Sequence, residues 1–180
     1  MRNVFLSVII ILSLSGYASS QLKEKENLLG GSLGFWAKGN VPMIGINFES
    51  NVVQEGIGTI GIGGMFRFYS YTYSYSNGDS RKYSFSSFGA QFNYNFNQIG
   101  DGKFVPYAGI VLGYNNVNNT YTDVTKHGVY ITDEAYSSGA WLWAQFGMRY
   151  FFSHNVAGTV RLGVGNNDFN TLELGVDFKL

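Results

Sequence analysis

The side chains best suited to chemistry are six charged residues in segments that contain little other charge. They are three arginines and three carboxylates, each within a stretch where apolar and polar residues alternate: Glu49, Arg67, Arg149, Arg161, Glu173 and Asp177. Opposite charges in a low-polarity interior need each other, because burying a lone charge is costly. The sequence therefore predicts an internal charge network. It acts either as a permanent plug or as a gate whose Arg–carboxylate pairs exchange partners and open a thin water path.

Signals for enzymatic chemistry are poor. The chain has no cysteine, and its two histidines, His127 and His154, lack the spacing of a metal pair. Neither histidine belongs to a recognisable nucleophile–base arrangement. The acidic residues of the longest loop (Asp123, Asp133 and Glu134) are typical of a solvated loop. We predict no enzyme, no metal site and no cofactor.

The charged residues lie in segments of strict alternation, of which the last, about 170–180, is the clearest. One face carries Leu172, Leu174, Val176, Phe178 and Leu180, and the other carries Glu173, Gly175, Asp177 and Lys179. This period of two is typical of a β-strand with one apolar face. Seven further segments show it, at about 28–38, 43–51, from 57, to 97, 104–118, 141–150 and 156–164.

No charged side chain falls on the apolar face of these eight segments. Such a face suits lipid, because Lys or Arg at the bilayer midplane costs roughly 2–4 kcal/mol. An even number of strands can close on itself and leave no edge in hydrocarbon. The sequence predicts an all-β fold, an eight-stranded antiparallel up-and-down transmembrane β-barrel. A soluble periplasmic ligand-binding barrel is the less favoured alternative.

The N-terminus predicts export. Arg2, the apolar run Val4–Leu14 and the small residues Ala18–Ser20 form the pattern of a cleaved signal peptide over residues 1–20. Residues 21–27 read as a short, flexible periplasmic lead-in, and residues 28–180 as the barrel. Without Arg2 the chain has 11 basic and 12 acidic side chains, a net charge of −1, so no basic excess predicts nucleic acid binding.

These features resemble the small eight-stranded outer-membrane barrels of the OmpA/OmpX type. The stretch Glu173–Leu180 is similar to the C-terminal signal of that family, although Leu180 stands where an aromatic residue is usual. The resemblance implies a Gram-negative outer-membrane location among outer-membrane lipid. It also implies insertion by the barrel-assembly machinery through Gly175, Phe178 and Leu180. We expect a monomer.

Turn lengths predict the orientation and an external hairpin. The connections near 52–55, 98–102 and 153–155 are short, as periplasmic turns are, whereas the 119–135 connection is long. On the opposite side from the short turns, a hairpin at Asn77-Gly78 carries tyrosines: Tyr69, Tyr71, Tyr73, Tyr75 and Tyr83. They either stiffen the hairpin by cross-strand stacking or form a contact surface for an external protein or ligand. Because Tyr83 and Phe85 are out of phase with Phe88, either a bulge near Ser86-Ser87 resets the face or the hairpin stands in water.

A register centred on Asn167 places Arg161 opposite Glu173. Arg67 and Arg149 are expected to pair with Glu49 and Asp177. The predicted role is structural or surface-interacting, a membrane plug that displays external loops. The alternative is a narrow, low-conductance pore gated by the interior pairs.

Overall fold

The computed structural model describes residues 22–35, 41–76, 78–97, 102–123, 128–130, 138–166 and 170–180. Within these ranges no helix is long and apolar enough to cross a membrane. The predicted signal peptide, Asn167, His127 and most of the 119–135 loop lie outside the described residues.

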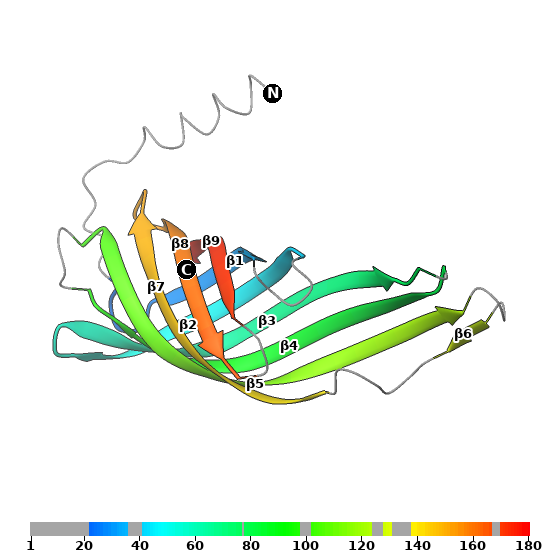
Figure 1. Ribbon diagram of the computed structural model, residues 1–180. Coiled ribbons are helices and arrows are strands. Elements are labelled where there is room, and N and C mark those ends of the chain that lie inside the picture. Colours follow the sequence, from blue (N-terminus) through cyan, green and yellow to red (C-terminus); the bar gives the residue numbers. More distant parts are fainter. Residues whose placement is uncertain are drawn as a thin grey trace, which may run out of the picture.

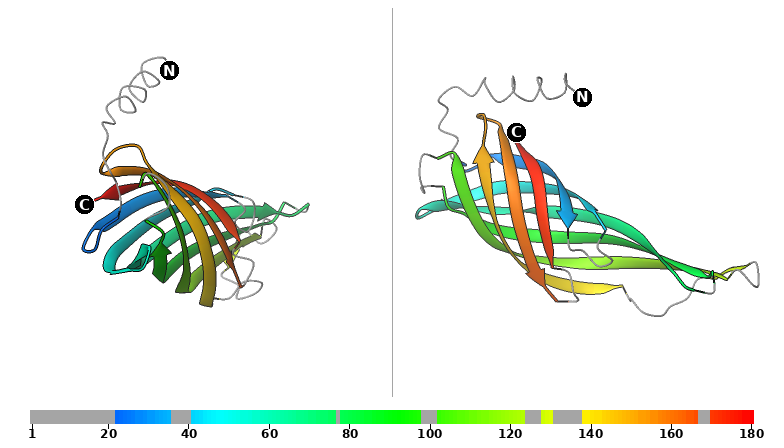
Figure 2. Two further views of the ribbon diagram at one scale, coloured as in Figure 1. Left: turned by 90° about the vertical axis from the view of Figure 1, so that its left-hand side faces the viewer. Right: turned by 45° about the horizontal axis from the view of Figure 1, so that its top comes forward.

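Eight strands close an antiparallel barrel in chain order (Figures 1 and 2). They are β1 (Asn27–Phe35), β2 (Met43–Glu55), β3 (Gly58–Ser74), β4 (Ser80–Asn95), β5 (Phe104–Asp123), β7 (Gly139–Phe151), β8 (Val156–Gly165) and β9 (Thr171–Lys179). The β1–β9 pairing joins the first strand to the last, so that a sheet that is continuous through β4–β5 and β5–β7 has no open edge around the barrel. A three-residue strand, β6 (Gly128–Tyr130), pairs only with the end of β5. The predicted eight-stranded up-and-down barrel is confirmed.

The two faces of the wall follow the predicted alternation. On β9, Glu173 is 1% exposed whereas its neighbour Leu174 is 49% exposed, and Leu112 on β5 reaches 65%. Successive side chains of a strand point to opposite sides, so alternation in sequence becomes an apolar exterior and a polar interior. This is the reverse of a soluble barrel and fits a wall that faces lipid.

Strands β3, β4 and β5 extend well beyond the others and form a tall wall on one side of the barrel (Figure 1). Their pairing is continuous from Thr59↔Asn95 to Ser74↔Ser80, without a bulge near Ser86-Ser87. Tyr83 and Phe85 therefore keep the inward phase of Gln91 and are buried. A shift in strand register does occur on β2, between Asn51 and Val53. Of the two interpretations of the hairpin, the bulge is wrong.

The outward face of this wall changes character within one row of residues. The row Phe66, Phe88 and Tyr114 is fully aromatic, whereas the next row toward the hairpin tip is Phe68, Ser86 and Asn116. Beyond it the outward positions carry only small polar residues, amides and one lysine: Ser70, Thr72, Ser74, Ser80, Lys82, Ser84, Asn118, Thr120 and Thr122. This line marks the upper limit of the apolar belt.

The lead-in 22–26 packs against the end of the barrel that bears the short turns and the C-terminus. Leu22 is buried, and its carbonyl accepts a hydrogen bond from Asn97 Nδ2 at 2.7 Å. Glu26 forms an ion pair with Lys179 at 3.2 Å, and its carbonyl accepts from the Asn51 backbone N–H at 2.9 Å. Through these contacts Leu22–Glu26, expected to be a flexible lead-in, helps to close the apolar end of the lumen.

Candidate functional site

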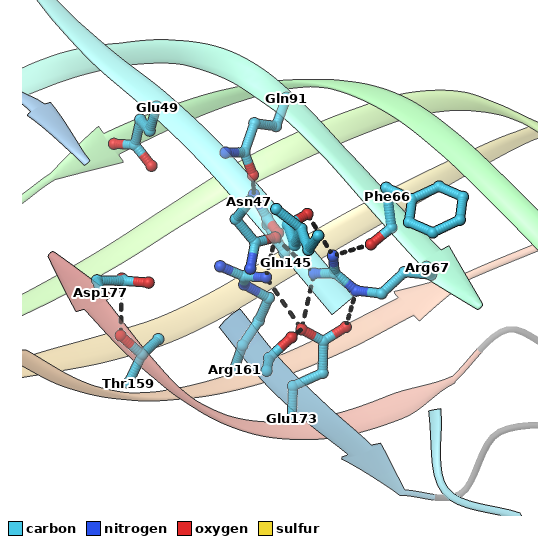
Figure 3. A network of polar contacts seen from close by, with 12 residues as sticks. Asn47, Glu49, Phe66, Arg67, Gln91, Gln145, Thr159, Arg161, Glu173 and Asp177 are labelled. Carbon is cyan, nitrogen blue, oxygen red and sulfur yellow. Dashed lines mark hydrogen bonds and ion pairs between the residues drawn. The ribbon is translucent and has the colours of Figure 1, made fainter. Parts of the chain in front are cut away.

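Glu173 on β9 lies between two arginines in the middle of the lumen (Figure 3). Arg67 on β3 approaches it in a bidentate manner, with Nε 2.7 Å from Oε1 and Nη2 2.7 Å from Oε2. Arg161 on β8 places Nη1 3.0 Å from Oε2. Asn47 Oδ1 accepts a hydrogen bond from each arginine, at 2.6 Å and 2.8 Å. We call Arg67, Arg161 and Glu173 the central triad; its net charge is +1.

The Arg67 guanidinium is fully used. Besides its bonds to Glu173 and Asn47, Nη1 donates to the backbone carbonyls of Phe66 at 2.8 Å and Ile46 at 3.1 Å. These contacts match the five N–H donors of an arginine. A charge held in this way is fixed to the β2–β3 wall as well as to its ion-pair partner.

Arg149 on β7 forms a second group nearer the short turns. Its Nη2 lies 2.8 Å from Glu49 Oε2 on β2, and its Nε lies 2.7 Å from Asp177 Oδ2 on β9. Nη1 donates to Asn95 Oδ1 at 2.6 Å. We call Arg149, Glu49 and Asp177 the lower triad; its net charge is −1, which balances the central triad.

The strand register of the sequence prediction holds, but the pairing across the lumen differs in part. Arg161 lies opposite Glu173 in the β8–β9 ladder, as predicted. Arg149 does pair with both Glu49 and Asp177. The expectation that Arg67 shares those two partners was wrong, because the tilt of the strands brings Arg67 level with Glu173 instead.

Residues that the sequence analysis did not single out join the two triads. Tyr107 on β5 accepts a hydrogen bond from Arg161 Nε at 2.8 Å, while the Arg149 guanidinium carbon lies 4.3 Å from the centre of its ring. Asn93 and Asn95 donate to Glu49 at 2.7 Å and 2.6 Å. Their inward phase was readable from the alternation, but nothing local indicates which charge they contact.

Inward glycines leave the space that the long side chains occupy. A Cβ at Gly45 would lie 2.8 Å from Arg67 Nε, and one at Gly113 would lie 2.5 Å from Trp141 Cε2. Likewise, a Cβ at Gly147 would collide with the ring of Tyr107. A barrel of eight strands is only wide enough for its side chains to fill. Glycine beside Arg67, Trp141 and Tyr107 is thus a condition for this interior.

Apolar side chains close the lumen on both sides of the charges. At the end with the short turns the lower cap consists of Leu22, Leu28, Val105, Phe151 and Ala157. Toward the hairpin, Trp141 and Trp143 pack edge to face at 5.3 Å, and above them the upper cap consists of Met43, Tyr69, Tyr83 and Phe85. A cavity of about 10 Å³ remains beside Trp143 and Thr171, the size of one water molecule.

The predicted tyrosine surface divides into two parts. Tyr69 and Tyr83 are buried in the upper cap, with Tyr69 stacked on Phe85 at 4.5 Å, and they are not on the external surface. Tyr71 is half-buried and packs against Tyr83 at 5.2 Å. Tyr73 and Tyr75 are 56% and 40% exposed. These two exposed rings pack edge to face at 5.0 Å, so ring contacts continue from the buried to the exposed part of the hairpin.

The three residues of the predicted C-terminal signal have distinct surroundings. Phe178 and Leu180 are exposed on the lipid side. Gly175 lies against β1, where a Cβ would stand 2.5 Å from the Gly31 carbonyl oxygen. The barrel wall itself therefore requires glycine at 175, whatever its part in insertion.

No cluster of three His, Asp or Glu side chains suited to a metal ion occurs among the described residues. His154 stands exposed in the β7–β8 turn. The arrangement in the lumen can hold charge and exclude water, and the charged groups of the two triads are engaged with one another and with neighbouring amides.

No family model matches the sequence, and no curated protein does. Among solved structures, the chain is similar to Ail, the attachment invasion locus protein of Yersinia pestis, in complex with the heparin analogue sucrose octasulfate. That match has 12% identity and a TM-score of 0.58, and it covers 88% of this chain and 100% of Ail. A second Ail structure gives 11% identity and a TM-score of 0.51 over the same shares.

A de novo designed transmembrane β-barrel is also similar, with 14% identity and a TM-score of 0.52, covering 89% of this chain and 99% of the design. The chain has the fold of the small eight-stranded transmembrane β-barrels that its sequence resembles.

Proposed function

We propose that this protein is an integral outer-membrane β-barrel with a sealed interior, whose role is to anchor and display the β3–β5 wall outside the cell. The sealed lumen is the observation that carries the proposal. Lower cap, lower triad, central triad, tryptophan pair and upper cap follow one another along the barrel, and Arg67, Arg149 and Arg161 are each no more than 2% exposed.

The exterior supports the membrane location. Large apolar side chains on every strand of the barrel are exposed, and the belt ends abruptly at the row of Phe66, Phe88 and Tyr114. A soluble periplasmic barrel would leave this surface in water, where apolar patches of such size are rare. We expect a monomer that the barrel-assembly machinery inserts, with the short turns in the periplasm.

Conductance tests the sealed interior. The refolded protein, its folding checked by the heat-modifiable gel shift, is added to a planar bilayer beside the Arg161→Ala variant. We expect no steady channel openings from either protein, because the two caps stay in place in the variant. Openings in the wild type that change in the variant would favour a gated pore.

The gated pore has one observation in its favour. Glu173 is shared between Arg67 and Arg161, so one arginine could release it without leaving it unpaired. The caps argue against this function, because exchange within the triads leaves the Trp141–Trp143 pair and Phe151 in the path. We therefore place the pore second.

The display role assigns the contact surface to Tyr73 and Tyr75 at the tip of the wall. Aromatic rings exposed on a stiff support are typical of recognition surfaces, since they lose little conformational entropy on binding. Arg81, whose guanidinium carbon lies 5.5 Å from the centre of the Tyr121 ring, borders them. The partner would be a protein or a surface saccharide.

Binding arrays test this assignment. Vesicles that carry the barrel are applied to immobilised glycans and matrix proteins, and signals of the wild type are compared with those of Tyr73→Ala/Tyr75→Ala. Ser74→Ala is the matched control, because Ser74 lies between the two tyrosines on the opposite face. Loss of binding in both variants, or in neither, would contradict the assignment of the contact surface to the tyrosine face.

A further inference from the structure

We propose that a groove on the lipid-facing side of β3, β4 and β5 is a binding site for one acyl chain of a membrane lipid, from the leaflet on the side of the long hairpin. The groove is open and shallow, with a volume of about 890 Å³. This inference rests on the membrane location proposed above and adds a specific ligand site to a belt that otherwise contacts lipid without preference.

Two neighbouring outward rows form the groove. The first row runs Phe48, Gly64, Ala90 and Leu112 across β2 to β5, so that its two central positions are small and its two ends are large. The second row carries Phe66 and Phe88, whose rings lie 5.0 Å apart and form one wall. The floor is the backbone around Gly64, Gly89 and Gly113.

The packing of the barrel wall does not require glycine at position 64. A Cβ there would meet nothing closer than 3.6 Å, which is ordinary contact, whereas a Cβ at its neighbour Gly63 would collide with the Phe48 carbonyl. Glycine within a strand weakens it. Glycine at 64 thus leaves a hollow, flanked by phenylalanines, that the packing of the wall does not impose.

The dimensions and chemistry of the groove indicate a single hydrocarbon chain. It crosses three strand spacings of about 4.8 Å, roughly 14 Å in all, and its central depression is one residue row wide. Its lining has no charged side chain, and Tyr114 offers the one polar side-chain group. A second barrel would need an interface of about 1,000 Å² or more, which a slot of one row cannot provide.

The position of the groove sets the leaflet. Phe66, Phe88 and Tyr114 form the last aromatic row before the outward face turns to Ser86 and Asn116. A chain lying below this row belongs to a lipid whose head group stands at the level of those polar side chains. The groove is continuous with the lipid-facing belt, so the chain enters it directly from the bilayer.

Photo-crosslinking tests the site. The full protein is refolded into phosphatidylcholine vesicles that contain some phosphatidylcholine with a diazirine on one acyl chain, and the adducts are mapped by mass spectrometry after illumination. Gly64→Leu places a branched side chain in the depression, and its Cβ would meet nothing closer than 3.6 Å. Gly31→Leu is the matched control, because Gly31 is also outward and its Cβ would meet nothing closer than 4.0 Å, but it lies outside the groove.

We expect adducts to concentrate on the peptides around Gly63–Phe66 and Gly89–Ala90. The yield of adducts on these peptides should fall about threefold in Gly64→Leu. The effect is modest because the site holds an acyl chain by packing contacts alone. In Gly31→Leu the yield should not change. Adducts spread evenly over the belt, or an equal loss in both variants, would overturn the proposal.

A second copy as the occupant has its own signature. A bifunctional linker would then capture dimers that Gly64→Leu abolishes and Gly31→Leu retains, and this result would also overturn the acyl-chain site. Failure of the proposed membrane location is distinguishable, since the protein would then not enter vesicles or show the gel shift of a folded barrel.

Discussion

Removing Arg149 should destabilise the barrel more than removing Arg161, although both are buried arginines that contact carboxylates. Arg149 is the cation between Glu49 and Asp177, at 2.8 Å and 2.7 Å. Arg161→Ala leaves Glu173 with its bidentate partner Arg67. The two substitutions remove the same charge and differ in how many carboxylates they leave without a cation.

The magnitudes follow from this difference. Leaving a buried charge uncompensated typically costs about 3–5 kcal/mol, and Arg149→Ala does so for two carboxylates in one place. Arg161→Ala breaks charge-assisted hydrogen bonds but leaves the central triad neutral, which costs about 1.5–3 kcal/mol. We expect Arg149→Ala to cost at least about 4 kcal/mol and to exceed Arg161→Ala by at least about 2 kcal/mol.

Urea unfolding of the refolded barrel in lipid vesicles measures the loss of stability in both single variants. Trp141 and Trp143 are buried in the lumen, so their fluorescence reports its opening. Neutralising the two carboxylates that lose their cation, in the same chain (Arg149→Met with Glu49→Gln and Asp177→Asn), should recover most of the lost stability. Equal costs for the two single variants, or a triple variant weaker than Arg149→Ala, would refute the assignment of charges to two triads.

Three further predictions concern the wall and its lower end. Ile110→Arg, near the middle of the apolar belt on β5, should cost roughly 2–4 kcal/mol and impair insertion, whereas Thr120→Arg, outward on the same strand above the belt, should insert normally in a vesicle-folding assay. Gly175→Ala should lower the urea midpoint, because its Cβ would stand 2.5 Å from the Gly31 carbonyl, while Gly31→Ala should not. Leu22→Ala should cost about 2–3 kcal/mol in the same titration, and an unchanged midpoint would mean that the lower cap does not depend on the lead-in.

Strand number and facing were predictable because both depend on local alternation. In Leu172–Leu180, as in the other segments, a period of two assigns every residue to one of two faces, and the apolar face must meet lipid. The Arg161–Glu173 contact was predictable for the same reason, since a hairpin sets its own register.

Contacts across the lumen were not predictable, because the strand tilt and shear of the closed barrel decide them. Arg67 and Glu173 are 106 residues apart, and no local pattern relates their heights. The burial of Leu22 was equally hidden, because the charged residues around it are typical of a flexible lead-in. The facing of Tyr83 and Phe85 was hard to predict for another reason. Above the apolar belt the inward positions carry aromatic residues and the outward positions carry polar ones, although the alternation of the strand continues unchanged.

The first strand of the tall wall contains a dipeptide repeat, Tyr69-Ser70, Tyr71-Thr72, Tyr73-Ser74 and Tyr75-Ser76. Since a dipeptide is also the period of a strand, adding or deleting one unit on each strand of the wall leaves every side chain on its face. Each such step would change the reach of the wall by about 7 Å. The length of the projection can thus evolve by small in-frame duplications without any change to the barrel below it.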